Sequence, residues 1–240
     1  MKRSMKPGTM LYPLPAVLVT GGDMENSTVM TAAWTGIVNS DPPMTYVSIR
    51  PERCSYGIIK ERGEFVINLT TADMAKDVDY AGCVSGRKED KFEKLGFVKE
   101  PGEIVKAPLI AQCPVSLECR VTETKELGSH TMFLAEIVRV HADEKLFDAN
   151  DRICLEKAGL LAYIHGGYLP LGTRKLGTFG YSVMKPKTQK KKAAESRKMS
   201  LMKKKSKHAA PKKKESVFTG KSRLVSRSWR MAILPWRMAL

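Results

Sequence analysis

Short runs of alternating apolar and polar residues, separated by turn residues, dominate the first two thirds of the chain. In the segment 44–50, Val47 and Ile49 fall on one face while Ser48 and Arg50 fall on the other, which is the two-residue period of a half-buried strand. The same criteria predict further strands over residues 16–20, 29–38, 65–69, 115–124, 131–140 and 160–164.

Three short helical segments are expected between these strands. The first begins at Ser55, whose hydroxyl can cap it, and ends before Gly63. The second ends at Gly82, and the third, over 90–95, ends at Gly96. Closely spaced strands without a regular strand–helix–strand rhythm argue against a doubly wound parallel sheet. The pattern therefore predicts a mainly β fold with added helices, in the form of an antiparallel barrel.

Positive charge is concentrated at the end of the chain. Of 41 Lys and Arg residues, 19 lie from Lys185 onward, together with two of the 25 Asp and Glu residues, which leaves 22 bases and 23 acids in residues 1–184. We therefore expect a nearly neutral domain over 1–184 and a Lys-rich, disordered tail over 185–240, since its lysine runs repel one another and bury no apolar surface.

Cysteine content and hydropathy bear on the compartment. The five cysteines are odd in number and include no C-x-x-C pair, so we expect reduced thiols without a disulfide framework or a metal site. No apolar run reaches the roughly 18 residues of a membrane span. The apolar stretch near the N-terminus is interrupted by Pro13 and Pro15, which favours a strand over a signal peptide. These observations predict a cytoplasmic protein.

Motifs of several common enzyme classes are missing from the sequence. It contains no G-x-x-x-x-G-K-[ST] phosphate loop, no G-x-G-x-x-G, no H-E-x-x-H and no G-x-S-x-G. Polar residues gather instead at the ends of the predicted strands around Trp34; they are Thr28, Thr35, Asn39, Ser40, Ser48, Arg50, Ser55, Asn68, Ser85 and Lys91. This mixture suits a ligand with a flat ring, a polyol chain and a phosphate, while ordinary turn and capping roles stay open.

Several spaced segments together resemble one family. They are Met30-Thr-Ala-Ala-Trp-Thr-Gly-Ile-Val-Asn-Ser-Asp-Pro-Pro43, Tyr46-Val-Ser-Ile-Arg50, Gly63-Glu-Phe-Val-Ile-Asn-Leu69, Ser85-Gly86, Asp90-Lys-Phe92 and His165-Gly-Gly-Tyr-Leu-Pro-Leu-Gly172. In this order they are similar to the flavin reductase-like proteins, most of all to the flavoredoxin type, over about residues 10–182. The resemblance implies an antiparallel, Greek-key-like split β-barrel that binds FMN, forms a homodimer and transfers electrons, with NADH or NADPH as the donor.

The resemblance also assigns site residues. Trp34 is expected beside the isoalloxazine ring, and Lys91 is expected to reach the phosphate. The remaining positions carried over are Ser40, Ser48, Ile49, Arg50 and Ser55 on the ribityl-phosphate side, Asn68 and Leu69 through backbone contacts, and His130 and Tyr163 completing the pocket. Thr28 stands where the family pattern has Asn, and its hydroxyl can still form a hydrogen bond.

Three functions remain open at this point. The first is a reductase that passes electrons from NAD(P)H through bound FMN to free flavin or to a partner protein. The second is a flavoredoxin-like electron carrier that does not turn over NAD(P)H. The third is of another class: the basic tail, 185–240, would bind nucleic acid or an anionic surface without sequence specificity. No catalytic acid or base is expected in the first two, because the chemistry takes place on the flavin.

Overall fold

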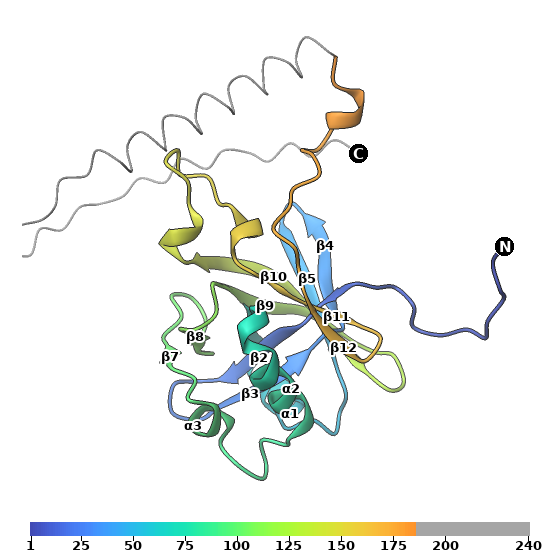
Figure 1. Ribbon diagram of the computed structural model, residues 1–240. Helices are drawn as coiled ribbons and strands as arrows, with labels where there is room; N and C mark the ends of the chain where they lie inside the picture. Colours follow the sequence, from blue (N-terminus) through green and yellow to red (C-terminus); the bar gives the residue numbers. More distant parts are fainter. Residues whose placement is uncertain (186–240) are drawn as a thin grey trace, which may run out of the picture. The chain divides into compact units, whose positions relative to one another are not determined.

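The computed structural model describes residues 1–185 (Figure 1). By its contacts the chain divides into Met1–Leu176 and a unit that begins at Gly177, of which residues 177–185 are described. The second unit contributes a single 3-10 turn, Tyr181–Val183, within those described residues. The predicted domain boundary near residue 184 stays a prediction, as does the proposed role of the basic tail, whose residues 186–240 lie outside the described part of the chain.

Antiparallel strands form three sheets in the first unit. The strands are β1 (Leu14–Pro15), β2 (Val17–Gly22), β3 (Ser27–Ala32), β4 (Thr35–Ser40), β5 (Pro43–Ile49), β6 (Glu64–Leu69), β7 (Lys99–Glu100), β8 (Leu109–Ile110), β9 (Val115–Glu126), β10 (Thr131–Ala142), β11 (Leu161–Ile164) and β12 (Gly167–Pro170). The largest sheet has the order β3-β2-β6-β9-β10-β5-β4, and two smaller ones have the orders β1-β11-β12 and β7-β8. The predicted mainly β, antiparallel architecture with added helices is confirmed.

Three α-helices accompany the sheets. They are α1 (Cys54–Arg62), α2 (Ala75–Cys83) and α3 (Lys91–Leu95), with additional 3-10 turns at Ala72–Met74, Glu144–Leu146 and Leu155–Lys157. Helix α1 packs against β2 and α2 packs against β3 (Figure 1). Glycines allow both approaches: a Cβ at Gly21 would lie 3.0 Å from Ile59, and one at Gly82 would lie 3.2 Å from Thr31.

The main core lies on the inner face of the large sheet. Alternate residues of each strand point inward, so that Val17 and Val19 of β2 pack with Val47 and Ile49 of β5, and all four are almost fully buried. This pattern confirms the two-residue period predicted for residues 44–50. Burial of these branched side chains is the main source of stability for the sheet.

The predicted strand over 29–38 is wrong in one respect, because the structure divides it into two strands. Residues up to Ala32 pair with β2, whereas those from Thr35 pair with β5, so the two halves lie at opposite edges of the large sheet. No Gly or Pro marks the break at Ala33 and Trp34. The position of the break is decided by pairing with strands that are distant in the sequence. A local pattern of residues cannot show that pairing.

The helix boundaries agree only in part with expectation. Asp90 caps α3 by accepting hydrogen bonds from two backbone amides, and Gly96 ends it in a left-handed conformation (φ 64°), as predicted. Ser55, by contrast, lies inside α1, where its hydroxyl is buried and 3.0 Å from the Thr28 hydroxyl. Gly82 does not end α2 either, because the helix continues to Cys83.

One strand of the smaller sheet was missed. The sequence pattern predicts no strand after residue 164, but residues 167–170 form β12, which pairs with β11 through the turn at His165 and Gly166. Both turn residues have positive φ values, 46° and 87°. A glycine with positive φ is typical of a tight hairpin turn. The strand that follows the turn is too short to be recognised from its sequence pattern.

Among residues 1–185, no helix is long and apolar enough to cross a membrane. The five cysteines are all free. No group of three or more His, Cys, Asp or Glu side chains in the described part of the chain could hold a metal ion.

A buried carboxylate ties the loop that follows β7 to the sheet. Glu118 of β9 is completely buried and accepts hydrogen bonds from the backbone amides of Glu103, Ile104 and Val105 at 2.7–2.9 Å. The His141 Nε2 lies 2.5 Å from Glu118 Oε1, the oxygen that also accepts from the Glu103 amide. Burial disfavours the charged form, but the hydrogen bonds from His141 and from the three amides outweigh it and lower the pKa of Glu118.

We predict that Glu118→Gln lowers the free energy of unfolding by about 2 kcal/mol at pH 7, because a buried set of charge-assisted hydrogen bonds is disrupted. A carboxylate whose pKa is lowered by folding stabilises the protein above its unfolded pKa of about 4.3, and this contribution is lost as the pH falls. The difference between the two proteins in urea unfolding should therefore shrink below about pH 4. Glu123→Gln, at an exposed position of the same strand, is the control; equal stabilities of all three proteins at pH 7 would contradict the prediction.

Candidate functional site

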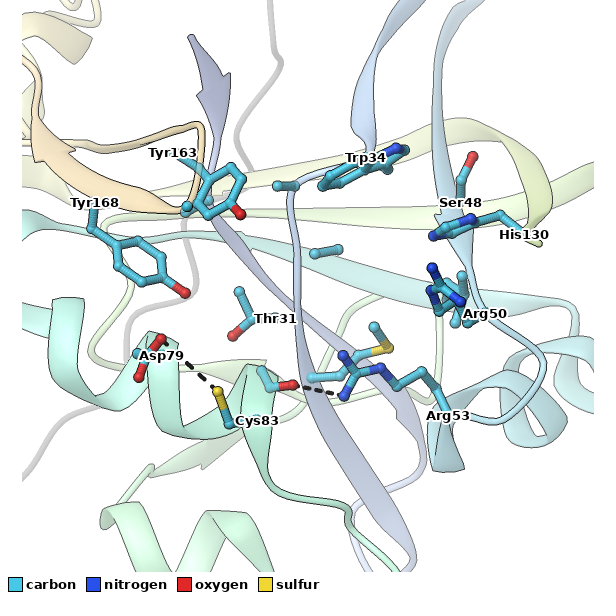
Figure 2. Close-up of a pocket in the computed structure, with 17 residues that line it drawn as sticks. Thr31, Trp34, Ser48, Arg50, Arg53, Asp79, Cys83, His130, Tyr163 and Tyr168 are labelled. Carbon is cyan, nitrogen blue, oxygen red and sulfur yellow. Dashed lines mark hydrogen bonds between the residues drawn. The ribbon is translucent and has the colours of Figure 1, made fainter. Parts of the chain in front are cut away.

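A cavity of about 370 Å³ opens where the chain leaves β3 and joins β4. Its walls come from β3 to β5, helix α2, the tip of the β9–β10 hairpin and the small sheet of β11 and β12. Figure 2 shows its main side chains, which are Thr31, Trp34, Ser48, Arg50, Arg53, Asp79, Cys83, His130, Tyr163 and Tyr168. The break in the predicted strand thus creates the opening at which Trp34 lies.

A second, more polar cavity of about 290 Å³ adjoins the first. It is formed by the start of α1 and the connection between α2 and α3, and it is lined by Glu52, Cys54, Ser55, Ser85, Gly86 and Lys91. Arg50, Arg53 and Cys83 line both cavities, so the two form one continuous site. A side chain at Gly86 would contact Cys54 and Thr28, and its absence keeps this space open.

Lys91 is the most unusual charge of the polar cavity. Its side chain is only 5% exposed, and its Nζ donates hydrogen bonds to the carbonyl oxygens of Ala81 (2.8 Å) and Val84 (3.2 Å) at the end of α2. Burial, and then the nearby charge of Arg53, lower its pKa to about 8. No carboxylate among residues 1–185 forms an ion pair with it. A buried cation of this kind favours an anionic ligand.

Arg53 holds the two helices in place beside this cation. It is the residue directly before α1, and its Nη1 donates a 2.6 Å hydrogen bond to the Gly82 carbonyl in α2. The sequence interpretation missed it. One sequence signal could have indicated it. Arg53 stands just before the predicted helix, shortly after Arg50 and Pro51, and helix N-termini are common sites of anion binding.

Aromatic rings line the larger cavity on the side away from Lys91. The Trp34 indole and the His130 imidazole are stacked with centroids 6.1 Å apart and planes 7° apart, and Tyr163 lies 6.5 Å from the indole. Burial, and then the positive charge of Arg50, lower the pKa of His130. Its Nδ1 lies 2.9 Å from the Ser129 hydroxyl. Neutral imidazole at pH 7 suits contact with a flat ring.

The chain matches the model of the flavin reductase like domain over residues 9–172. It belongs to the flavin reductase-like family. Its structure resembles the flavoredoxin of Desulfovibrio vulgaris (Miyazaki F), at 34% identity and a TM-score of 0.70, over 76% of this chain and all of that one. The flavoredoxin of Methanosarcina acetivorans matches at 30% identity and a TM-score of 0.69, over 77% of this chain and all of that one. The resemblance to the flavoredoxin type is confirmed.

Two further matches extend the comparison. An uncharacterized protein of Archaeoglobus fulgidus is 42% identical over 134 residues, which are 55% of this chain and 75% of the relative. A flavin reductase of Shewanella frigidimarina with a split barrel domain shares the fold, at 20% identity and a TM-score of 0.63, over 70% of this chain and 86% of that one. The predicted split-barrel fold is thereby confirmed.

Many of the residues predicted from the family pattern meet at this site. Trp34, Ser48, Ile49, Arg50, His130 and Tyr163 line the larger cavity, and Ser55, Ser85 and Lys91 line the polar one together with Arg50. Thr28 lies directly behind Ser55, to which it is hydrogen-bonded. The family pattern therefore located both the aromatic wall and the cationic end.

Five further predicted residues do not line either cavity, so their contact with the cofactor stays a prediction. The Asn68 amide is buried within the sheet and is bonded to Leu18, Ile110 and Ser116, while Leu69 lines a separate apolar cavity. Residues Thr35, Asn39 and Ser40 belong to β4; the first donates to the Tyr46 carbonyl, and the other two are exposed at the far end of the strand.

Three further cavity residues were not foreseen: Asp79, Cys83 and Tyr168. The first two lie one helical turn apart on α2, with the cysteine sulfur 4.0 Å from the carboxylate, and Tyr168 faces them from β12 (Figure 2). Their i,i+4 spacing was a usable signal that they share one helix face. Tyr168 belongs to β12, the strand that the sequence pattern did not predict.

The described residues fit a flavin mononucleotide. A phosphate would complement Lys91 and the two arginines, and serine hydroxyls suit a polyol chain. The adjoining aromatic cavity suits a tricyclic ring, which would lie against Trp34. Open space at Gly86 leaves room beside the cations.

We predict that the His130 imidazole titrates below the ordinary histidine value of about 6.5. Arg50→Gln should raise its pKa by removing a nearby positive charge, whereas Arg50→Lys should leave it low. The pKa is measured by NMR titration of the imidazole resonances. Indistinguishable titration curves for wild type and Arg50→Gln would show that Arg50 does not act on this ring.

Proposed function

We propose that this chain binds FMN across the two adjoining cavities and is an oxidoreductase that passes electrons from NADH or NADPH to free flavin or to a redox partner. The observation that supports this most strongly is the buried Lys91 ammonium, which has Arg50 and Arg53 beside it and no carboxylate partner. An anionic group bound there would complement these cations, and the adjoining cavity is aromatic. FMN combines both features in one molecule.

The residues of the site would hold the cofactor in distinct ways. Lys91 and Arg53 would bind the phosphate by charge-assisted hydrogen bonds, with Ser55 and Ser85 as further donors. Trp34 would support one side of the ring system. The buried Lys91, the half-buried Arg53 and the exposed Arg50 would also offset the phosphate charge.

Bound FMN supplies the redox chemistry, since it can accept a hydride and release electrons singly or in pairs. The protein has to position the reactants and exclude water. His130 and Trp34 are stacked at the cavity, and Tyr163 closes it from the small sheet. None of these roles requires a general base, which agrees with the expectation of no catalytic acid or base.

Relatives support a nicotinamide donor and an electron-transfer role. A protein of Archaeoglobus fulgidus named as a ferric-chelate reductase (NAD(P)H) is 26% identical over 102 residues, which cover 42% of this chain and 59% of that protein. The two flavoredoxins favour a second candidate, an electron carrier that receives its electrons from another protein and does not react with NAD(P)H. Both candidates require the same FMN site.

A homodimer is part of this proposal. Strand β4 is an edge of the large sheet, and its Ile37 and Val38 are 83% and 49% exposed. In the N-terminal arm, which extends away from the sheets in Figure 1, Leu11 is 86% exposed. Apolar residues on an unpaired edge favour association with another chain. Five free cysteines favour a cytoplasmic location for such a dimer.

We predict that the purified protein is yellow and that Lys91→Met weakens FMN binding by about 10–100-fold, the effect of one buried charge-assisted contact. Riboflavin lacks the phosphate, so its affinity should change far less. Both affinities are measured by quenching of flavin fluorescence. Lys94→Met, at an exposed position of α3, is the control. An equal loss for the two flavins would place the phosphate elsewhere.

Anaerobic mixing of the FMN-loaded protein with NADH or NADPH separates the two candidate functions. We expect rapid bleaching of the flavin absorption band with at least one of them, because the cavity that would hold the flavin ring is open to solvent-borne ligands beside Tyr163 and Tyr168. Retention of the band with both donors, followed by bleaching with dithionite, would favour the carrier. A protein that binds no FMN at micromolar concentration would contradict both.

A further inference from the structure

The larger cavity carries opposite charges at its two ends. Arg50 lies at one end, beside His130, and Asp79 lies at the other, beside Tyr168, while the Arg53 guanidinium lies between them, bonded to the Gly82 carbonyl (Figure 2). The cationic end is continuous with the polar cavity proposed for the FMN phosphate. The acidic end lies away from this polar cavity, and its charge limits which groups can bind there.

Asp79 is not neutralised by its surroundings. Its side chain projects from α2, the residue is exposed, and no Lys, Arg or His among residues 1–185 forms an ion pair with it. Its carboxylate forms hydrogen bonds with the Cys83 sulfur, at 4.0 Å, and with the Tyr168 hydroxyl, neither of which is a cation. An uncompensated carboxylate at a cavity attracts cations and hydrogen-bond donors and repels anions.

Aromatic rings flank this acidic end. Tyr163 and Tyr168 are in edge contact with centroids 5.7 Å apart, and Tyr163 continues to Trp34 at 6.5 Å. Tyrosine rings stabilise flat ligands through their faces and attract cationic ones in particular. The same end thus combines a negative charge with aromatic walls.

We propose that Asp79, together with the rings of Tyr163 and Tyr168, forms a charge-selective subsite for the ring of the second ligand, a planar nitrogen heterocycle that is cationic or carries a carboxamide donor. This inference rests on the proposed function and specifies the part of the site that receives the nicotinamide. Asp79 is a specificity-determining residue in this arrangement.

The charge has a direct use in the proposed reaction. When a dihydronicotinamide loses a hydride from its C4, two electrons and a proton leave together for the bound FMN, and the neutral ring becomes a pyridinium cation. The carboxylate of Asp79 stabilises that cation relative to the neutral ring. It also accepts a hydrogen bond from the carboxamide, and it repels the carboxylate of the corresponding acid.

The test uses the FMN-loaded full-length protein and three small rings that differ in charge: the 1-methylnicotinamide cation, neutral nicotinamide and the nicotinate anion. Their dissociation constants are obtained by titration, from the change each causes in the visible absorption of the bound flavin. In the wild type we expect the cation to bind about tenfold or more tightly than the anion, because the sign of one nearby charge–charge interaction is reversed.

Two variants separate charge from shape. Asp79→Asn should reduce the difference between cation and anion to less than about threefold, while Asp77→Asn, on the same helix but outside both cavities, should leave it unchanged. Tyr168→Phe keeps the ring and should keep the charge preference. Because Asp79 is exposed, its replacement by Asn is expected to leave the fold intact.

Several outcomes overturn the inference. They are an equal affinity of the wild type for all three rings, the absence of any spectral change, and an unchanged preference in Asp79→Asn. Loss of FMN from Asp79→Asn but not from Asp77→Asn would also overturn it, because Asp79 would then hold the cofactor. Failure of the proposed function itself is seen beforehand, as a wild-type protein without flavin absorption or as FMN that neither donor reduces.

Discussion

The site depends on the division of one stretch of chain between two edges of the large sheet. β3 pairs with β2 and β4 pairs with β5, so the backbone has to cross from one edge to the other at Ala33 and Trp34. The Ser48 amide donates a 2.9 Å hydrogen bond to the Trp34 carbonyl and fixes this crossing to β5. Since the crossing leaves the regular ladder, the indole is held at the rim of a cavity instead of being packed into the core.

The helices place charge where the sheet leaves this opening. Asp90 caps α3 and so orients Lys91 toward the last carbonyls of α2, while Arg53 joins the start of α1 to the same helix end. The negative end of the α2 dipole partly compensates these cations. Burial and the nearby Arg53 charge nevertheless lower the pKa of Lys91 to about 8, as expected where two carbonyl contacts replace only part of the hydration of an ammonium group. An anion completes this arrangement better than water does.

Much of the fold could be predicted from local patterns, because strands such as 44–50 and the capped helix before Gly96 are specified by their own residues. The break at Trp34 could not be predicted, since it is decided by strands far away in the sequence.

At the site, the order of the family's motifs along the chain identified Lys91 and His130 as cavity residues. It did not show that the Asn68 side-chain amide is bonded within the sheet, because an amide in a strand looks the same whether it faces a ligand or bonds to neighbouring strands. Arg53, Asp79 and Tyr168 meet only through packing of separate elements, so neither composition nor spacing brought them together.

Burial distinguishes the two charged ends of the site by the kind of ligand each can serve. A cation that is 5% exposed, such as Lys91, loses much of its hydration in the folded chain, so an anion bound there should be retained for long times. Asp79 is exposed and stays hydrated when no ligand is present, so binding beside it gains less and release is fast. A redox protein needs both properties at once: a cofactor that stays and a reactant that leaves. In the proposed arrangement, the difference in exposure between these two residues would provide both properties within one site.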